Sequence, residues 1–325
     1  MPKPLPQYLN DFLDYLEVEK GSTSVTSLNY SRFIQKFFQW LKQNHLQDLS
    51  PDGLTEEHVR KYRMWLSRLP NSTHKAQSGL TISTQTRYLI ALRAFLSFFH
   101  ERSIPTLPTE KIKLPKERRE RIVKFLDLEQ VEKLLLAPDT KNPIGLRNRA
   151  ILETLFSTGM RVAELTALDR KHLEGAENKK DFEMSIIGKG GYPRTVYFSK
   201  RALDWIKQYL AYREDEEEAL FIRLKGSPNR LTVRMIESLF EKYSKKSGIP
   251  LLATPHTLRH SFATDLLNQG VDLRSVQEFL GHRNIATTQI YTHVTNKRLR
   301  EIHRRYHGGG TKSKSPSPNI EEEVA

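Results

Sequence analysis

HTLRHSFATDLLNQGVDLRSVQEFLGHRNIATTQIY, residues 256–291, holds reactive side chains at spacings that make the rest of the chain intelligible. Pro255 comes directly before it and predicts the first turn of a helix, where the missing proline N–H costs no hydrogen bond. His256 and Arg259 are three residues apart, so they share one face of this helix and can point at the same ligand. The stretch therefore begins with an imidazole and a guanidinium on one helical face.

The second half of the stretch adds two more reactive side chains. A short apolar run predicts a helix over residues 272–280, which Gly281 ends. His282 lies just beyond that helix end, and Tyr291 follows nine residues later. Two histidines, an arginine and a tyrosine at these spacings predict a site that cuts nucleic acid.

Composition agrees with a nucleic-acid partner. The chain has 325 residues, enough for two domains, and a formal net charge of +14 with an isoelectric point near 9.7. Such an excess indicates an extended polyanion as partner, although solvated basic faces are the plainer alternative. The absence of cysteine excludes disulfides and thiolate metal sites. Neither a signal peptide nor a membrane-spanning run is recognisable, so we expect a cytoplasmic, nucleoid-associated protein without a membrane partner.

The N-terminal part is predicted to be a helical domain over residues 1–104. Apolar residues recur at helical spacing over about 5–20, 24–42 and 88–99, and Thr55 caps a further helix. The aromatic residues follow this apolar period, so we expect them in a core rather than on the surface stacking against bases. Exposed basic residues such as Arg60 are candidates for phosphate contacts.

Residues 105–124 change the character of the sequence. This segment contains three prolines and a dense basic run, with almost no helical periodicity. We interpret it as an interdomain linker, either an ordinary solvated connector or a basic strap along a duplex. A second domain is predicted over residues 125–307, and the tail 308–325 is too polar to build a core and should be disordered.

In the second domain, Asp127 and Gln130 form a predicted capping box. A further helix, over about 144–156, ends at Gly159, so that Arg161 begins the next one, which is predicted to continue through Leu168. An anion would stabilise a guanidinium at a helix start. Glu164, one turn later, offers the alternative: it either pairs with Arg161 or orients it toward a ligand. Further helices are predicted over these ranges: 200–212, 232–247, 255–268, 272–280, a segment around Tyr291, and 295–306.

A single hairpin supplies the predicted β structure. FEMSII and RTVYF alternate and flank the turn GKGG, which is typical of two antiparallel strands. The fold class is therefore mainly α with a small β-hairpin sheet (α+β). Lys189 stands on the turn. By itself it is best explained as a solvent-exposed lysine, but a lysine at a hairpin tip can also reach into a groove and protonate a leaving oxygen.

Four segments carry a resemblance to a known family. They are STGMRVAELTAL (157–168), IIGKGGYPRTVYF (186–198), the stretch from Thr254 to Val294, and NKRLREIHRRYH (296–307). Their order and spacing resemble the tyrosine recombinase or phage integrase family, most closely its Xer branch. The N-terminal half is similar to the family's SAM-like core-binding domain only in helical pattern.

The resemblance implies a set of catalytic residues at matching motif positions. Arg161 and Arg259 are implied as phosphate clamps, His256 as the base, Lys189 as the acid, His282 as a hydrogen-bond donor to the phosphate and Tyr291 as the nucleophile. Neither a metal nor another cofactor is implied, since two guanidinium groups stabilise the phosphate charge. Tyr192 and Tyr306 are alternative nucleophiles of lower rank. Each of these side chains also has an ordinary structural explanation.

The resemblance also implies partners and an architecture. The two domains would grip double-stranded DNA at a specific recombination site as a C-shaped clamp. Four protomers, identical or paralogous, would assemble, with residues 295–306 docking onto a neighbour and a DNA-translocating motor protein as a further partner. The preferred function is Xer-like resolution of chromosome or plasmid dimers during cell division. The alternatives are integration and excision of a mobile element, an inactive architectural DNA-binding protein, and a topoisomerase of related mechanism.

Overall fold

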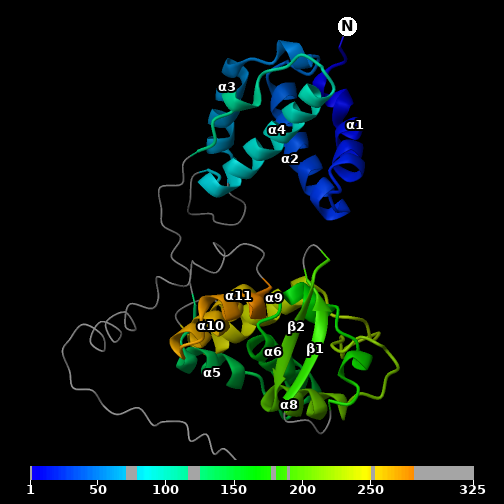
Figure 1. The fold of residues 1–325 in the computed structure, drawn as a ribbon, viewed down its shortest axis with the longest axis vertical. Helices are drawn as coiled ribbons and strands as arrows, with labels where there is room; N and C mark the ends of the chain where they lie inside the picture. The colour runs from blue at the N-terminus through cyan, green and yellow to red at the C-terminus, as the bar shows by residue number, and fades with distance from the viewer. Residues whose placement is uncertain are drawn as a thin grey trace, which may run out of the picture. The chain divides into compact units, whose positions relative to one another are not determined.

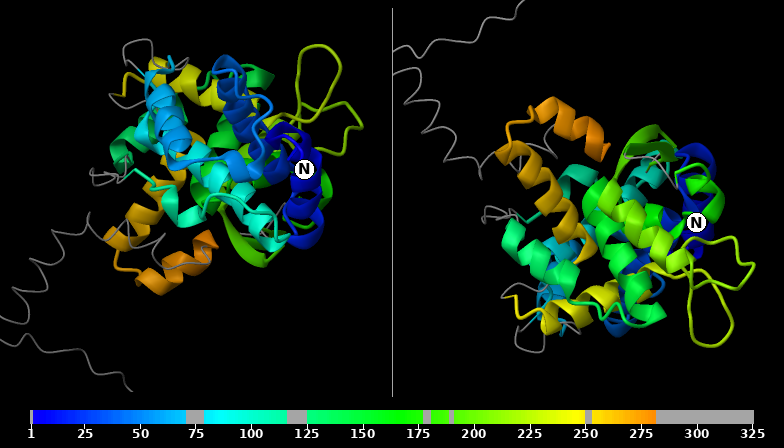
Figure 2. Two further views of the ribbon diagram at one scale, coloured as in Figure 1. Left: turned by 90° about the horizontal axis from the view of Figure 1, so that it is seen from above. Right: turned by 90° about the horizontal axis from the view of Figure 1, so that it is seen from below.

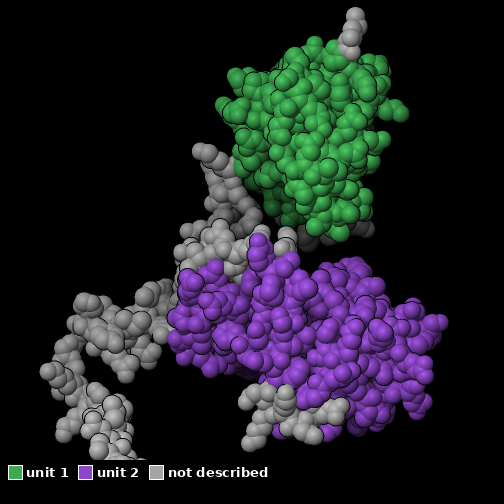
Figure 3. Space-filling model, turned by 45° about the vertical axis from the view of Figure 1, so that its right-hand side comes forward, with its two compact units in different colours: residues 1–120 green, residues 121–325 purple. Residues whose placement is uncertain are grey.

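The structure, a computed structural model, forms two compact units, residues 1–120 and 121–325 (Figures 1 and 3). Each unit has an apolar core of its own. The residues described are 2–70, 79–115, 125–176, 181–188, 191–249 and 253–281.

The described part of the first unit is built from helices. Threonines cap the three longest: the hydroxyls of Thr23, Thr55 and Thr81 each accept a hydrogen bond from the N–H group three residues later. The short helical turns are η1 (Leu5–Tyr8), η2 (Tyr15–Glu19), η3 (Pro51–Gly53) and η4 (Thr109–Lys111), and the α-helices are α1 (Leu9–Asp14), α2 (Ser24–Gln43), α3 (Glu56–Arg68) and α4 (Ile82–Glu101).

Aromatic rings form the centre of this core. Phe12, Phe37 and Phe95, from α1, α2 and α4, are almost fully buried, as is Tyr62 of α3. Ring centroids lie 5.1 Å apart for Phe12 and Phe95 and 5.0 Å apart for Phe37 and Tyr62, both near edge-to-face. The prediction that these aromatics are core residues is confirmed.

The described half of the predicted linker, residues 105–115, packs on the first unit. Ile112 is fully buried in its core. The Thr106 hydroxyl donates a hydrogen bond to the carbonyl of Pro51 at 3.0 Å. Prolines keep this segment extended, and its apolar side chains then anchor it to the helices. Residues 116–124 lie outside the described residues.

The second unit combines helices with one hairpin. In chain order its elements are α5 (Leu128–Leu136), α6 (Pro143–Thr158), α7 (Val162–Thr166), η5 (Arg170–Leu173), β1 (Asp181–Ile187), β2 (Pro193–Ser199), α8 (Lys200–Leu210), α9 (Val233–Lys246), α10 (Pro255–Asn268) and α11 (Leu273–Leu280). The predicted fold class, mainly α with a small hairpin sheet, is confirmed. Among the residues described, no helix is long and apolar enough to cross a membrane.

Helix α6 lies at the centre of this unit. It contacts α5, α7, α8, α10 and β2, and most of its residues are buried, including the polar Asn148 and Arg149. Buried polar groups need partners. Asn148 donates to the Tyr243 hydroxyl at 2.9 Å, and Arg149 pairs with Glu153. Helices α10 and α11 lie side by side at one edge of the unit (Figures 1 and 2).

The hairpin has a fixed register. Asp181 pairs with Ser199 and Ile187 with Pro193, and the N–H of Gly188 closes the turn by donating to the carbonyl of Tyr192 at 2.8 Å. On β2, alternate residues point to the core, so that Val196 and Phe198 are buried. Strand β2 contacts both α6 and α11.

Most predicted element boundaries agree with the structure, with one clear difference. The helix that begins after Arg161 was expected to continue through Leu168, but α7 ends at Thr166. The reason is an extended segment that starts there: the carbonyl of Leu168 accepts from the N–H of Leu220, and Arg170 donates to the carbonyl of Glu218. The predicted helices around Tyr291 and over 295–306, and the predicted disordered tail 308–325, lie outside the described residues.

Candidate active site

Helix α10 holds the first two candidate residues. The Thr254 side chain caps it by accepting from the N–H of Thr257 at 3.0 Å, and Pro255 occupies the first turn as predicted. Arg259, one turn further on, is 3% exposed. It donates from Nη1 to the carbonyl of Gly159 at 2.5 Å and from Nη2 to the carbonyl of Leu280. A buried guanidinium is thus held by two backbone oxygens.

Both carbonyls belong to helix ends that terminate in left-handed glycines. Gly159 (φ 58°) ends α6 and Gly281 (φ 60°) ends α11, a conformation that side chains other than glycine rarely adopt. At Gly159 a Cβ would also come within 2.5 Å of the Phe262 ring. The carbonyl ends of the two helices therefore converge on Arg259, and their partial negative charge favours a cation there.

Arg161 binds the same helix end from another direction. It is the N-cap residue of α7, and its Nη2 donates to the carbonyl of Gly281 at 3.3 Å. Its Nη1 lies 3.0 Å from Glu164 Oε1, and its backbone N–H donates to Glu164 Oε2 at 2.7 Å. The side chain is 31% exposed. Arg161 and Arg259 are therefore anchored on consecutive carbonyls, those of residues 281 and 280.

Glu164 is shared by two arginines. Besides Arg161, it binds Arg194 of β2 through both carboxylate oxygens, with Nη1–Oε1 and Nη2–Oε2 distances of 2.8 Å. Burial alone would raise the pKa of Glu164, but the hydrogen bonds from Arg194 and Arg161 hold that pKa below its ordinary value. The carboxylate is therefore ionised and paired.

His256 lies near Arg161 and Arg259, and their positive charges affect its pKa. Partial burial, together with the positive charges of Arg259 and Arg161, lowers the pKa of His256 below its ordinary value. Its ring packs edge-on against His260, with centroids 4.1 Å apart. A neutral imidazole at this position is able to accept a proton near neutral pH.

The structure brings together three of the six predicted site residues, Arg161, His256 and Arg259. The other three, Lys189, His282 and Tyr291, lie outside the described residues, as does the alternative nucleophile Tyr306. Tyr192, the other alternative, is 58% exposed. Among the ranges that the structure describes, no three His, Asp or Glu side chains cluster closely enough to hold a metal ion.

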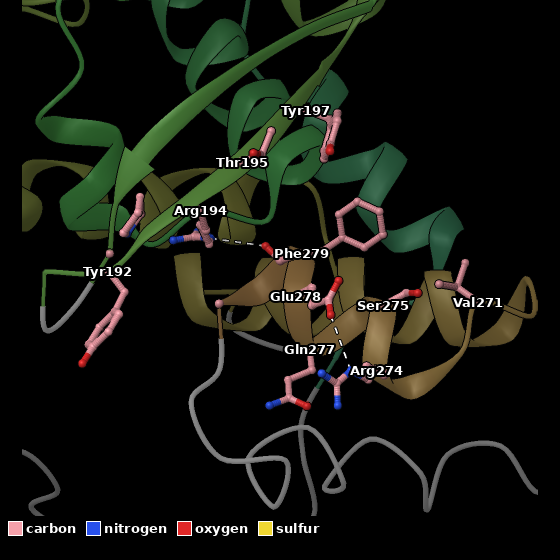
Figure 4. A pocket seen from close by; sticks show the side chains of 13 residues that line it. Tyr192, Arg194, Thr195, Tyr197, Val271, Arg274, Ser275, Gln277, Glu278 and Phe279 are labelled. Atoms are coloured by element: carbon pink, nitrogen blue, oxygen red, sulfur yellow. Dashed lines mark hydrogen bonds and ion pairs between the residues drawn. The ribbon is translucent and has the colours of Figure 1, made fainter.

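A groove of about 870 Å³ lies between the hairpin and α11 (Figure 4). Tyr192, Tyr197 and Phe279 supply aromatic surface, and the Tyr197 and Phe279 rings meet edge to face at 5.7 Å. Arg194 is among the residues that line this groove, and it donates to the carbonyl of Phe279 at 3.3 Å. The groove therefore adjoins the helix end on which Arg161 and Arg259 are anchored.

Sequence reasoning missed Arg194. Its signal is the period-2 alternation of β2, which places residue 194 on the same face as the buried Val196 and Phe198. A charged residue on the buried face of a strand requires a partner. Glu164, in the upstream segment 157–168, is the partner of Arg194.

The comparisons with known proteins agree with this geometry. Residues 124–298 match the family described as "Phage integrase family", and residues 9–103 match "Phage integrase, N-terminal SAM-like domain". The first match spans more than half of the chain. The chain therefore belongs to the phage integrase family, the tyrosine recombinases.

Relatives place it within that family. "Tyrosine recombinase XerD" of Listeria innocua is 36% identical over 92% of this chain and 98% of the relative, and "Tyrosine recombinase XerC" of Pelotomaculum thermopropionicum is 34% identical over 92% and 97%. The chain is a site-specific tyrosine recombinase of the Xer branch. These relatives do not favour the architectural or mobile-element alternatives.

Solved structures share the fold. One is XerH site-specific recombinase bound to palindromic difH substrate in a post-cleavage complex, with a TM-score of 0.71, 23% identity, and coverage of 94% of this chain and 97% of that one. Another is a lambda integrase dimer bound to a COC′ core site, with a TM-score of 0.65, 18% identity, and coverage of 96% and 80%.

Proposed function

We propose that this recombinase cuts DNA by attack of Tyr291 on a phosphodiester, with Arg161 and Arg259 clamping the nonbridging oxygens. The observation that carries the proposal is the anchoring of both guanidinium groups on the consecutive carbonyls of Leu280 and Gly281. Two cations fixed at one helix end can stabilise the charge that a phosphate develops in the transition state.

The other residues supply proton transfers. An ordinary tyrosine has a pKa of about 10, so a base must accept its proton during attack. His256 takes this role, since its lowered pKa keeps the imidazole neutral. As the bond from Tyr291 to phosphorus forms, the bond to the 5′-oxygen breaks, and Lys189 protonates that oxygen. The products are a 3′-phosphotyrosyl link and a free 5′-hydroxyl.

Sequence continuity supports the remaining role. His282 follows Gly281 by one peptide bond, and the Gly281 carbonyl accepts from Arg161. His282 donates a hydrogen bond to the same phosphate. The reaction reverses when a 5′-hydroxyl of another strand attacks the phosphotyrosine, so that strand exchange needs neither metal nor other cofactor.

The proposed partners are double-stranded DNA carrying a specific recombination site and further protomers, identical or paralogous. The DNA-bound XerH and the DNA-bound lambda integrase dimer have the same fold as this chain, which supports this choice. The net charge of +14 suits a polyanion. A clamp of the two units around the duplex, a tetrameric synaptic complex closed by residues 295–306, and activation by a DNA-translocating motor complete the proposal. Its cellular role is resolution of chromosome or plasmid dimers.

A nicked suicide duplex tests the assignment of the nucleophile. We expect the wild-type chain to form a covalent complex on a site captured from the source genome, and Tyr291→Phe to bind the same duplex without forming it. Tyr192→Phe is the matched control, because Tyr192 is an exposed tyrosine next to the groove. A covalent adduct in Tyr291→Phe, or its loss in Tyr192→Phe, contradicts the assignment.

A further inference from the structure

Arg194 is a buried cation whose contacts all lie within the protein. Its side chain is 7% exposed, and both of its terminal nitrogens bind Glu164 at 2.8 Å. Its Nε donates to the carbonyl of Phe279 at 3.3 Å, shown as a dashed line in Figure 4. Three of the five N–H donors of this guanidinium are therefore bonded to groups of the protein.

Glu164 connects Arg194 to the phosphate clamp. The same carboxylate that binds Arg194 also lies 3.0 Å from Nη1 of Arg161 and accepts the backbone N–H of that residue. Without Arg194, Arg161 would be the remaining cation bound to Glu164 among the residues that the structure describes. Arg161 would then be held by the carboxylate in competition with a phosphate.

Arg194 also fixes the carbonyl that Arg161 binds. A Cβ added to Gly281 would lie 2.5 Å from Cδ of Arg194, so the arginine stem fills the space next to this glycine. The hydrogen bond to the Phe279 carbonyl holds the same end of α11. At the hairpin, a Cβ added to Gly188 would lie 3.5 Å from Arg194 Nη1. One side chain thus joins the start of α7, the end of α11 and the base of the hairpin turn.

We propose that Arg194 is a positioning residue for recombination: it neutralises Glu164 and thereby leaves the Arg161 guanidinium available to the scissile phosphate. This inference rests on the proposed function, because it requires Arg161 to bind that phosphate. Arg194 acts through Glu164 and Arg161 and touches no reacting atom.

Charge compensation provides the test. The rate of covalent complex formation on a nicked suicide duplex is measured for Arg194→Met, Glu164→Gln and the double variant. Arg194→Met should slow the reaction by about 10²-fold, the usual effect of a misplaced catalytic group. In the double variant the neutral amide no longer competes for Arg161, so the rate should recover by about tenfold. A double variant faster than the single variant is the expected result.

A purely structural role gives the opposite order. If Arg194 only supports packing, the two substitutions weaken the fold together, and the double variant is as slow as Arg194→Met or slower; that order overturns the inference. Arg194→Lys, which keeps the charge but not the paired geometry, covers the case in which Arg194→Met does not fold: its rate should lie below wild type and rise when Glu164→Gln is added.

A control variant separates this effect from the loss of another arginine–glutamate ion pair. Arg201, which is 45% exposed, binds the buried Glu153 at 2.7 Å, and Glu153 also pairs with Arg149. Arg201→Met should lower stability and leave the rate of covalent complex formation unchanged. If the wild-type chain itself forms no covalent complex on any captured site, the proposed function fails; if it does and compensation is absent, only the inference about Arg194 fails.

Discussion

Replacement of Arg259 by lysine tests the arginine clamp through both stability and rate. Arg259 donates to the carbonyls of Gly159 and Leu280, whereas a single ammonium group can keep only one of two acceptors on different helices. A hydrogen bond from a charged donor contributes about 1.5–3 kcal/mol, so we expect Arg259→Lys to lower the free energy of unfolding by about 2 kcal/mol. Loss of one donor to the developing phosphate charge should slow covalent complex formation by on the order of 10²-fold.

The assay needs a signal from the second unit in the full chain. Hydrogen exchange in urea, followed in peptides from residues 143–158, reports the opening of α6, which carries the Gly159 acceptor at its end. Arg234→Lys is the matched control for stability, since the Arg234 side chain is 83% exposed. The same substitution at that surface position should change the free energy of unfolding by less than about 0.5 kcal/mol.

Two results would refute this reasoning. If Arg259→Lys and Arg234→Lys unfold at the same urea concentration, the carbonyl contacts of Arg259 do not hold α6 to α11. If stability falls and the covalent rate stays at the wild-type value, Arg259 is a structural cation and the phosphate clamp is wrongly assigned.

Three further variants test separate parts of the unit. Because the pKa of His256 is lowered, wild-type stability should fall as pH drops below about 6.5, and His256→Gln should remove this slope in urea unfolding. The hydrogen bond from Arg213 lowers the pKa of Asp215 to about 2, so Asp215→Asn should cost about 2 kcal/mol at pH 7 and flatten the acid unfolding curve between pH 4 and 2. Gly281→Ala should place a Cβ against Arg194 and slow covalent complex formation by about tenfold.

Each of these three predictions can be contradicted by a specific result. If the pH dependence of stability persists in His256→Gln, another group causes it. If Asp215→Asn leaves the acid part of the unfolding curve unchanged, the ion pair of Asp215 with Arg213 does not contribute to stability there. For Gly281→Ala the control is Gly175→Ala, which has a similarly positive φ of 77° but no atom within 4 Å of the added Cβ. Equal effects on the rate would mean that backbone strain, and not the contact with Arg194, is responsible.

Local sequence signals predicted most of the elements. Pro255 and the capping residue Asp127 marked helix starts that the structure confirms, and the GKGG turn marked the hairpin. These signals concern nearest neighbours along the chain, where backbone chemistry decides the conformation. The end of α7 was predicted too late because pairing of Leu168 with Leu220, far along the sequence, ends the helix.

The same distinction explains what sequence reasoning found and missed in the site. Spacing along one helix placed His256 and Arg259 on a common face, which needs only helical geometry. The pairing of Glu164 with Arg194 joins residues thirty positions apart on different elements, and no periodicity within either element reveals it. Alternation along β2 could have marked Arg194 as a buried cation, but it could not have named its partner.

The arrangement also accounts for how several cations coexist in one place. Arg161 and Arg259 repel each other, and burial together with their positive charges lowers the pKa of the neighbouring His256, which stays neutral. The carbonyl ends of α6 and α11 both point at this group and carry the partial negative charge of helix C-termini. Glu164 adds a full negative charge, which Arg194 offsets. The net charge of these side chains is therefore positive, and fixed backbone dipoles hold them in place. Under the proposed function, a phosphate would meet donors that are already oriented and would require little reorganisation.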